Sequence, residues 1–168
     1  MFTFRKLTEN DFELMYEWLN AEHVITWYTK KNVTLERVIE KYKPYVNGEK
    51  PTEPYVILHE DKAIGYIQTY RIDAYKAYSE LVGVPNSAGL DLFIGDAQYV
   101  HKGYGALAIM DFMAQVICKM EQIEAVVIGP SPNNKVANRA YEKAGFVYLK
   151  TFFNKNEDDS EYIMKIDL

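Results

Sequence analysis

The spacing of hydrophobic and polar residues changes several times along the 168-residue chain. Residues 2–6 alternate between the two classes, which predicts a short strand. After Thr8 the apolar residues recur at steps of three and four, and Asp11 stands where a capping box places an acid, so a capped helix is expected there. Thr34 predicts the cap of a second helix.

Strands dominate the rest of the pattern. Residues 54–59 and 63–72 are β-rich runs separated by a polar turn, so we interpret them as a hairpin. Further strands are predicted at residues 88–94, 125–128, 146–153 and 161–166, and helices at 106–120 and 134–143. Residues 73–87 have no clear period, and a connection of this length is often functional.

This order of elements predicts a mixed sheet with helices on both faces, in an α/β or α+β fold. The length allows one hydrophobic core, so a single domain over residues 1–168 is expected. The helix at 106–120 is expected to turn its large apolar residues inward, namely Leu107, Met110, Met113, Ile117 and Met120.

Composition and charge exclude several classes of function. The net charge of −5 argues against nucleic acid as a partner, because such binding depends on Lys and Arg. The single cysteine, Cys118, excludes an internal disulfide and a multi-cysteine metal site, and we expect it to lie in the core. The three histidines lack a second ligand at metal spacing, so no metal is expected. With neither a signal peptide nor a membrane-spanning run, a cytoplasmic protein is expected, either monomer or homodimer.

A turn with two glycines precedes the helix at residues 106–120. Gly103 and Gly105 allow backbone N–H groups to point outward, and the helix start adds partial positive charge, which suits a pyrophosphate. The pattern is neither a Walker A loop nor a complete dinucleotide fingerprint, and alone it fits a tight turn equally well. The candidate phosphate-binding residues are Val100, His101, Lys102, Gly103, Tyr104, Gly105 and Ala106.

A second segment, residues 134–146, changes this balance. Asn134, Ala137 and Tyr141 lie on one face of the predicted helix. Asn134 fits either a helix cap or an amide contact with a ligand, and Tyr141 fits either a core position or a hydroxyl that faces a reacting atom. Because the glycine turn lies upstream, we favour a functional interpretation of both residues.

Together the two segments resemble the signature of the GNAT N-acetyltransferase superfamily, whose members use acetyl-CoA. Other stretches are similar to aminoglycoside 6′-N-acetyltransferases and extend the resemblance over nearly the whole chain, among them Tyr16-Glu17-Trp18-Leu19-Asn20, Ile64-Gly65-Tyr66-Ile67-Gln68, Gly89-Leu90-Asp91 and Pro130-Ser131-Pro132-Asn133-Asn134. The resemblance implies a GNAT-like, mostly antiparallel sheet that splays at the cofactor cleft. It also implies acetyl transfer to a primary amine of a small cationic substrate, an aminoglycoside 6′-amine first.

The resemblance further assigns roles in catalysis. The strand Leu92-Phe93-Ile94 would bind the pantetheine arm of coenzyme A through its backbone. Asp91, an acid within an apolar strand, is the candidate base for the acceptor amine, since partial desolvation raises a carboxyl pKa. Tyr141 is the candidate acid for the coenzyme sulfur.

The acceptor pocket is harder to assign. Tyr66, Gln68 and Tyr70 share one strand face by the period of two, and with Trp27 they fit an aromatic and polar wall. The acids expected to attract a cationic acceptor, besides Asp91, are Glu80, Glu157 and Asp158.

Some positions depart from the aminoglycoside enzymes. Gly129 stands where they usually carry an acid, Leu92 stands where they often carry Gln, and Lys30 and Lys31 follow Trp27. These changes leave other acceptors open, such as a siderophore hydroxylamine, a polyamine or a protein N-terminus. A non-catalytic module that binds acyl-CoA is the alternative of a different class.

Overall fold

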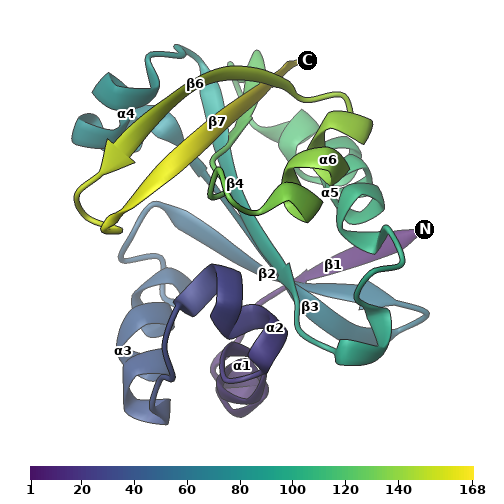
Figure 1. Cartoon of the computed structure of the whole chain (residues 1–168). Coiled ribbons are helices and arrows are strands. Elements are labelled where there is room, and N and C mark those ends of the chain that lie inside the picture. The colour runs from purple at the N-terminus through teal and green to yellow at the C-terminus, as the bar shows by residue number, and fades with distance from the viewer.

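The computed structural model describes residues 1–168 and contains one seven-stranded sheet in the order β1-β2-β3-β4-β5-β7-β6 (Figure 1). The strands are β1 (Phe2–Lys6), β2 (Thr52–His59), β3 (Lys62–Arg71), β4 (Ser87–Ile94), β5 (Ala125–Ile128), β6 (Val147–Asn154) and β7 (Asp159–Asp167). The α-helices are α1 (Phe12–Leu19), α2 (Glu22–Val24), α3 (Leu35–Val46), α4 (Lys76–Val82), α5 (Tyr104–Gln115) and α6 (Lys135–Lys143).

The sheet separates at its centre. Every neighbouring pair is antiparallel except β4 and β5, which run parallel and pair from Ser87↔Ala125 to Leu90↔Ile128. Strand β5 ends at Ile128, whereas β4 continues to Ile94. Beyond Leu90, β4 therefore pairs with β3 alone, and its other edge is open. The expected mixed, mostly antiparallel sheet that splays at its centre is confirmed.

Two hydrophobic layers attach the helices to the sheet. Trp18 of α1 and Tyr42 of α3 share one cluster with Tyr66 and Phe93 of the sheet. On the opposite face, Phe112 of α5 belongs to a second cluster with apolar residues of β2 to β5. Figure 1 shows α1–α3 grouped on one side and α5 with α6 on the other. Helices therefore cover both faces, as the sequence predicted.

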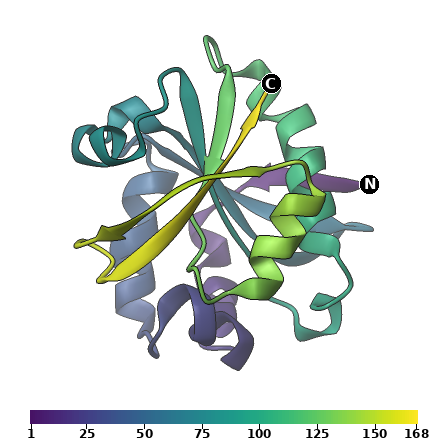
Figure 2. The same ribbon diagram turned by 45° about the horizontal axis from the view of Figure 1, so that its top comes forward.

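The hairpin of β6 and β7 extends past the end of β5. Figures 1 and 2 show this yellow-green ribbon running from the region of α6 to a tip near α3. At that tip Asp159 forms an ion pair with Lys30, with 2.6 Å between Oδ2 and Nζ. The hairpin is thus joined to the segment that follows the π-helical turn Ile25–Thr29.

The prediction for the helix at 106–120 was wrong in its extent and in part of its inner face, although Ile117 is buried and Met113 and Met120 pack against the core as expected. Helix α5 ends at Gln115, and its buried residues are Ala108, Ile109 and Phe112. Leu107 and Met110 are 51% and 50% exposed. Every residue from 106 to 110 is apolar, so hydrophobicity alone does not select a face.

Cys118 also differs from its prediction. It lies in the 3-10 turn Ile117–Lys119 after α5 has ended, and it is exposed rather than in the core. Residues 73–87, for which no element was predicted, contain helix α4.

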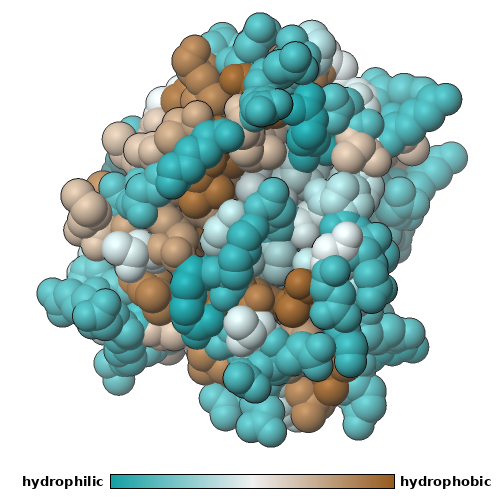
Figure 3. Space-filling view, turned by 180° about the vertical axis from the view of Figure 1, so that it is seen from behind, coloured by the Kyte–Doolittle hydropathy of each residue, from teal (hydrophilic) through white to brown (hydrophobic).

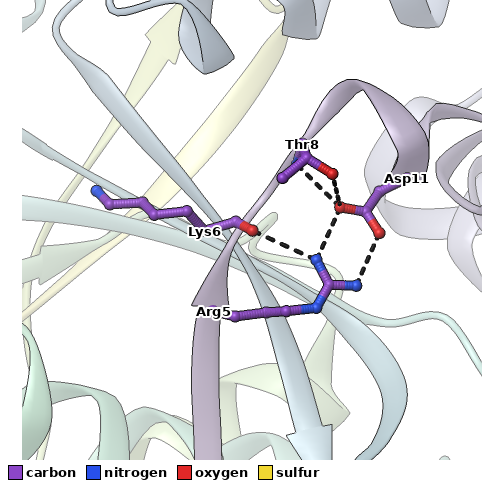
Figure 4. A network of polar contacts seen from close by, with 4 residues as sticks. All are labelled: Arg5, Lys6, Thr8 and Asp11. Atoms are coloured by element: carbon purple, nitrogen blue, oxygen red, sulfur yellow. Dashed lines mark hydrogen bonds and ion pairs between the residues drawn. The ribbon is translucent and has the colours of Figure 1, made fainter.

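The exit from β1 is fixed by a polar network (Figure 4). The guanidinium of Arg5 donates to both carboxylate oxygens of Asp11, at 2.8 and 2.7 Å. The backbone N–H of Thr8 donates to the same carboxylate at 2.9 Å. This network fixes the turn by which the chain enters α1.

Figure 3 shows the side of the molecule opposite to Figure 1, where hydrophilic residues cover most of the surface and hydrophobic ones lie between them. None of the helices combines the length and the apolar character that crossing a bilayer requires.

Candidate active site

Asp91 lies on the face of the sheet that carries α1 and α3, opposite polar residues of β3. The antiparallel register sets Gln68 against Asp91, Tyr66 against Phe93, and Tyr70 against Gly89. Tyr66, Gln68 and Tyr70 therefore share one face, as the period of two predicted. The ring of Tyr70 occupies the space above Gly89, where a Cβ would lie 2.4 Å from it.

A short chain of hydrogen bonds orients the Asp91 carboxylate. The hydroxyl of Tyr66 donates to Oε1 of Gln68 at 2.7 Å. The Gln68 Nε2 group then donates to Oδ2 of Asp91 at 2.8 Å. Tyr66 is fully buried, so it holds Gln68 from within the core and does not line the protein surface. Because the Gln68 amide is held at both ends, the carboxylate that it binds has a fixed direction.

Burial raises the pKa of Asp91 above its ordinary value, and the charge of Glu157 acts in the same direction. The hydrogen bond from Gln68 and the charge of Lys41 oppose this rise without cancelling it. Asp91 remains partly exposed. A carboxylate with a raised pKa that an acceptor can reach is suited to accept a proton from an amine.

Aromatic residues surround this carboxylate. Tyr28 packs edge-on against Phe93, with 4.8 Å between ring centroids. Burial raises the pKa of the Tyr28 hydroxyl well above its ordinary value, so this group stays protonated. Trp27, which the sequence placed in the acceptor wall, is 45% exposed in the same turn.

A second carboxylate, Glu161 of β7, lies in the same region. The hydroxyl of Tyr78, from α4, donates to Oε2 of Glu161 at 2.7 Å, and Nδ2 of Asn154 donates to Oε1. Burial raises the pKa of Glu161, and the negative charge of Asp91 adds to the rise. The two carboxylates therefore interact electrostatically.

The glycine turn forms the start of α5. Gly103 has φ of 76° and occupies the N-cap position, a backbone conformation that favours glycine. A Cβ at Gly103 or at Gly105 would meet no atom within 4 Å, so the space beside the turn is open. The first N–H groups of a helix lack intrahelical partners and bind anions well. Val100 is partly exposed, and His101 and Lys102 are exposed.

Helix α6 carries the second predicted segment. Oδ1 of Asn134 accepts a hydrogen bond from the backbone N–H of Ala137 at 3.1 Å, so Asn134 is the helix cap, and its Nδ2 group is left for a ligand. Tyr141 is partly buried, and both burial and the charge of Asp91 raise the pKa of its hydroxyl. This hydroxyl stays protonated and lies within electrostatic reach of Asp91.

The open edge of β4 lies between these parts. Leu92, Phe93 and Ile94 follow the point where β5 ends. The Nε2 atom of His23 is 2.9 Å from the carbonyl oxygen of Ile94, so the end of this strand is tied to α2. The remaining backbone groups on the β5 side have no strand to pair with.

The other predicted acids differ in position. Glu157 and Asp158 lie exposed in the turn between β6 and β7, and the charge of Glu157 reaches Asp91. Glu80 is exposed on α4, and no contact connects it with Asp91. Lys30, one of the cations that the sequence set against a cationic acceptor, is paired with Asp159.

One cavity lies away from Asp91. It measures about 790 Å³ and lies at the end of β3, with Tyr45, Tyr70 and Arg71 in its wall. Tyr70 is the residue that it shares with the Asp91 site. Its lining contains neither Asp91 nor the glycine turn.

Three residues of this region were missed by the sequence analysis: Tyr28, Tyr78 and Glu161. Glu161 left a usable signal, because residues 161 and 163 of a strand face the same side and Ile163 is fully buried. An acid in phase with a buried residue is unusual. Tyr78 left no such signal, since the helix that carries it was not predicted.

Comparison with known proteins identifies the family. The family model described as an acetyltransferase (GNAT) domain matches residues 8–153. The chain belongs to the GNAT acetyltransferase family. This acetyltransferase is 31% identical over 147 residues to an aminoglycoside N(6′)-acetyltransferase type 1 from Klebsiella pneumoniae. The aligned region covers 86% of this chain and 73% of the relative.

Solved structures agree. The crystal structure of aminoglycoside acetyltransferase AAC(6′)-Ib in complex with coenzyme A has a TM-score of 0.89 and 29% identity, over 99% of this chain and 95% of the other. The complex of AAC(6′)-Ib with coenzyme A and kanamycin has a TM-score of 0.87 and 28% identity, with the same coverage. The resemblance inferred from the sequence is confirmed.

Proposed function

We propose that this acetyltransferase transfers the acetyl group of acetyl-CoA to the 6′-amine of an aminoglycoside. The observation that carries the proposal is Asp91, a partly exposed carboxylate with a raised pKa, held by Gln68 next to the open edge of β4. The similarity to aminoglycoside N(6′)-acetyltransferases supports the choice of acceptor.

The residues present fit coenzyme A. The open turn at Gly103 and Gly105, at the start of α5, would hold the pyrophosphate through backbone N–H groups. The edge of β4 after Leu90 would hold the pantetheine arm. When bound, acetyl-CoA supplies the acetyl thioester.

The side chains then move protons. Asp91 accepts a proton from the acceptor amine, directly or through water, which leaves the nitrogen lone pair free to form the new N–C bond. As the C–S bond breaks, Tyr141 would donate its hydroxyl proton to the departing sulfur, and the second proton released by the acylated nitrogen would restore the Tyr141 hydroxyl. A backbone N–H of Phe93 or Ile94 would stabilise the negative charge that develops on the acetyl oxygen.

Thiol release from acetyl-CoA tests the proposal. The panel includes kanamycin, a matched sugar with a hydroxyl in place of the 6′-amine, spermidine, a hydroxylamine siderophore and a peptide with a free N-terminus. Release is expected with kanamycin and not with the hydroxyl analogue. Release with one of the other amines alone would replace the acceptor, and no release with any 6′-amino sugar rules out the aminoglycoside.

The Asp91→Asn variant separates catalysis from simple binding. Turnover is expected to fall at least about 100-fold, because a general base contributes on that order, whereas coenzyme A affinity should change little. Asp61→Asn, in the exposed turn between β2 and β3, is the control for an acid removed elsewhere. Unchanged turnover in Asp91→Asn contradicts the assigned role of Asp91.

A further inference from the structure

Glu161 occupies the space that a side chain at position 129 would need. A Cβ at Gly129 would lie 2.4 Å from Oε2 of Glu161 and 3.1 Å from Cδ1 of Ile163. The backbone N–H of Tyr162 donates to the carbonyl oxygen of Pro130 at 2.8 Å, which holds the segment after β5 against β7. The carboxylate that the sequence lacks at Gly129 is therefore present at the same place, supplied by β7.

The partners of Glu161 are neutral. Tyr78 and Asn154 each donate to one carboxylate oxygen, and no Lys, Arg or His forms an ion pair with Glu161. The residue is partly buried, and burial raises its pKa. A carboxylate that is desolvated without a cation is costly, and a bound ammonium group would relieve that cost.

Two tyrosines separate Glu161 from Asp91. Tyr70 interacts with the Asp91 carboxylate, and Tyr78 binds that of Glu161. The rings of Tyr70 and Tyr78 are tilted to one another, with 6.4 Å between their centroids. The charges of the two acids nevertheless influence each other. The site thus has two anionic positions with a pair of aromatic rings between them.

We propose that Glu161 binds a second ammonium group of the acceptor, distinct from the amine that receives the acetyl group. Glu161 is then a specificity residue, which makes the enzyme prefer acceptors with at least two amines. This inference rests on the proposed acetyl transfer, and it adds the class of acceptor that the site selects.

The first test compares acceptors in the Glu161→Gln variant, which keeps the size of the side chain and removes the charge. For an aminoglycoside with several amines, KM is expected to rise about 10- to 100-fold, as for a lost hydrogen bond to a charged group. For a 6′-amino sugar with no other amine, KM should not change. The KM for acetyl-CoA should stay close to wild type.

A relocated carboxylate tests the position itself. Glu161→Ala should raise KM for the aminoglycoside as Glu161→Gln does. Adding Gly129→Asp to Glu161→Ala places an acid in the space that was freed, and should recover most of the lost affinity. In Gly129→Asp alone, the new side chain would clash with the Glu161 carboxylate. This variant should have a lower melting temperature and no lower KM for the aminoglycoside.

The outcomes distinguish this inference from the proposed function. If wild type releases no thiol with any 6′-amino sugar, the proposed function itself fails. If wild type is active and Glu161→Gln changes KM equally for both acceptors, or for neither, only the role of Glu161 is overturned. Failure of Gly129→Asp to recover affinity in a folded Glu161→Ala protein also contradicts that role.

Discussion

Single side chains set the chemistry of the Asp91 site. The carboxylate is held by one amide, Gln68, which is itself held by the Tyr66 hydroxyl. The hydrogen bond from Gln68 stabilises the charged form of Asp91 and so opposes the rise in its pKa caused by burial. The pKa of the proposed base therefore depends on a residue that need not touch the substrate.

The pH dependence of the reaction follows from this bond. Gln68→Met removes a hydrogen bond that lowers the pKa of Asp91, so that pKa should rise further. Because Asp91 must be deprotonated to act, the acidic limb of the kcat/KM profile should shift to higher pH in the variant. The measurement is kcat/KM against pH.

Gln115→Met is the matched control for this prediction. This substitution also removes a hydrogen bond, because the Nε2 group of Gln115 donates to the Phe2 carbonyl oxygen at 2.9 Å. Gln115 lies on α5, away from Asp91. Its profile should keep the wild-type limb. An unshifted limb in Gln68→Met contradicts the proposal that Asp91 is the base.

At the scale of secondary structure, the proposed coenzyme site is built from the ends and edges of elements. Helix α5 begins at a glycine in the left-handed region, and the turn in front of it is open. Strand β5 is short, so the edge of β4 beyond Leu90 is free. One helix end and one strand edge thus form the proposed coenzyme site, with backbone groups as its main ligands.

Gly103→Val tests the helix start. Valine is strained at φ of 76°, and its side chain would fill the space beside the turn. The KM for acetyl-CoA is expected to rise at least about tenfold, because the backbone N–H groups would be blocked or redirected. Steady-state kinetics with varied acetyl-CoA measure this change.

Gly48→Val is the control, because it introduces the same backbone strain at a glycine outside the proposed coenzyme site. Gly48 has φ of 72° and open space around it, in the loop between α3 and β2. Both variants should lose about 1–3 kcal/mol of unfolding free energy, while Gly48→Val keeps the wild-type KM. Equal KM values in the two variants would argue that the turn does not bind the coenzyme.

At the scale of the whole molecule, contacts between successive elements complete the fold. Arg5 and Asp11 join the end of β1 to the start of α1 (Figure 4). Burial favours the neutral form of Asp11, but the hydrogen bonds from Arg5 and Thr8 outweigh it and hold the Asp11 pKa below its ordinary value. Asp11 therefore stabilises the folded state only while it is ionised.

Asp11→Asn should lower the free energy of unfolding by about 1–2 kcal/mol at neutral pH. This is toward the low end for a charged hydrogen bond, because the Arg5 side chain is 43% exposed. The contribution of a lowered pKa is fully present above the unfolded value, about 3.9, and is lost as pH falls through the folded value. The difference between wild type and variant should therefore shrink in acid.

Urea unfolding at several pH values measures this difference. Glu9→Gln is the control, since Glu9 contacts Lys43 only at 3.5 Å and both side chains are exposed. Its effect should stay within about 0.5 kcal/mol at every pH. A difference for Asp11→Asn that grows in acid would contradict this account.

The amino-acid sequence by itself determined most of the elements and indicated the donor half of the proposed site. The glycine turn and the segment with Asn134 and Tyr141 are each contiguous, and their helical or turn geometry follows from local spacing. The face shared by Tyr66, Gln68 and Tyr70 was also predictable, because alternation in a strand is local. Helix α5 was the exception, since its uniformly apolar start left the inner face undetermined.

Only the tertiary structure decided the acceptor half. Tyr28, Tyr78 and Glu161 come from three separate segments, and their meeting near Asp91 depends on sheet order and not on spacing. Gly129 was taken as the loss of an acid, yet β7 places the Glu161 carboxylate where that side chain would stand. A charge can be supplied to one position by any strand that reaches it, because electrostatic attraction depends on where the charge lies and not on which residue carries it.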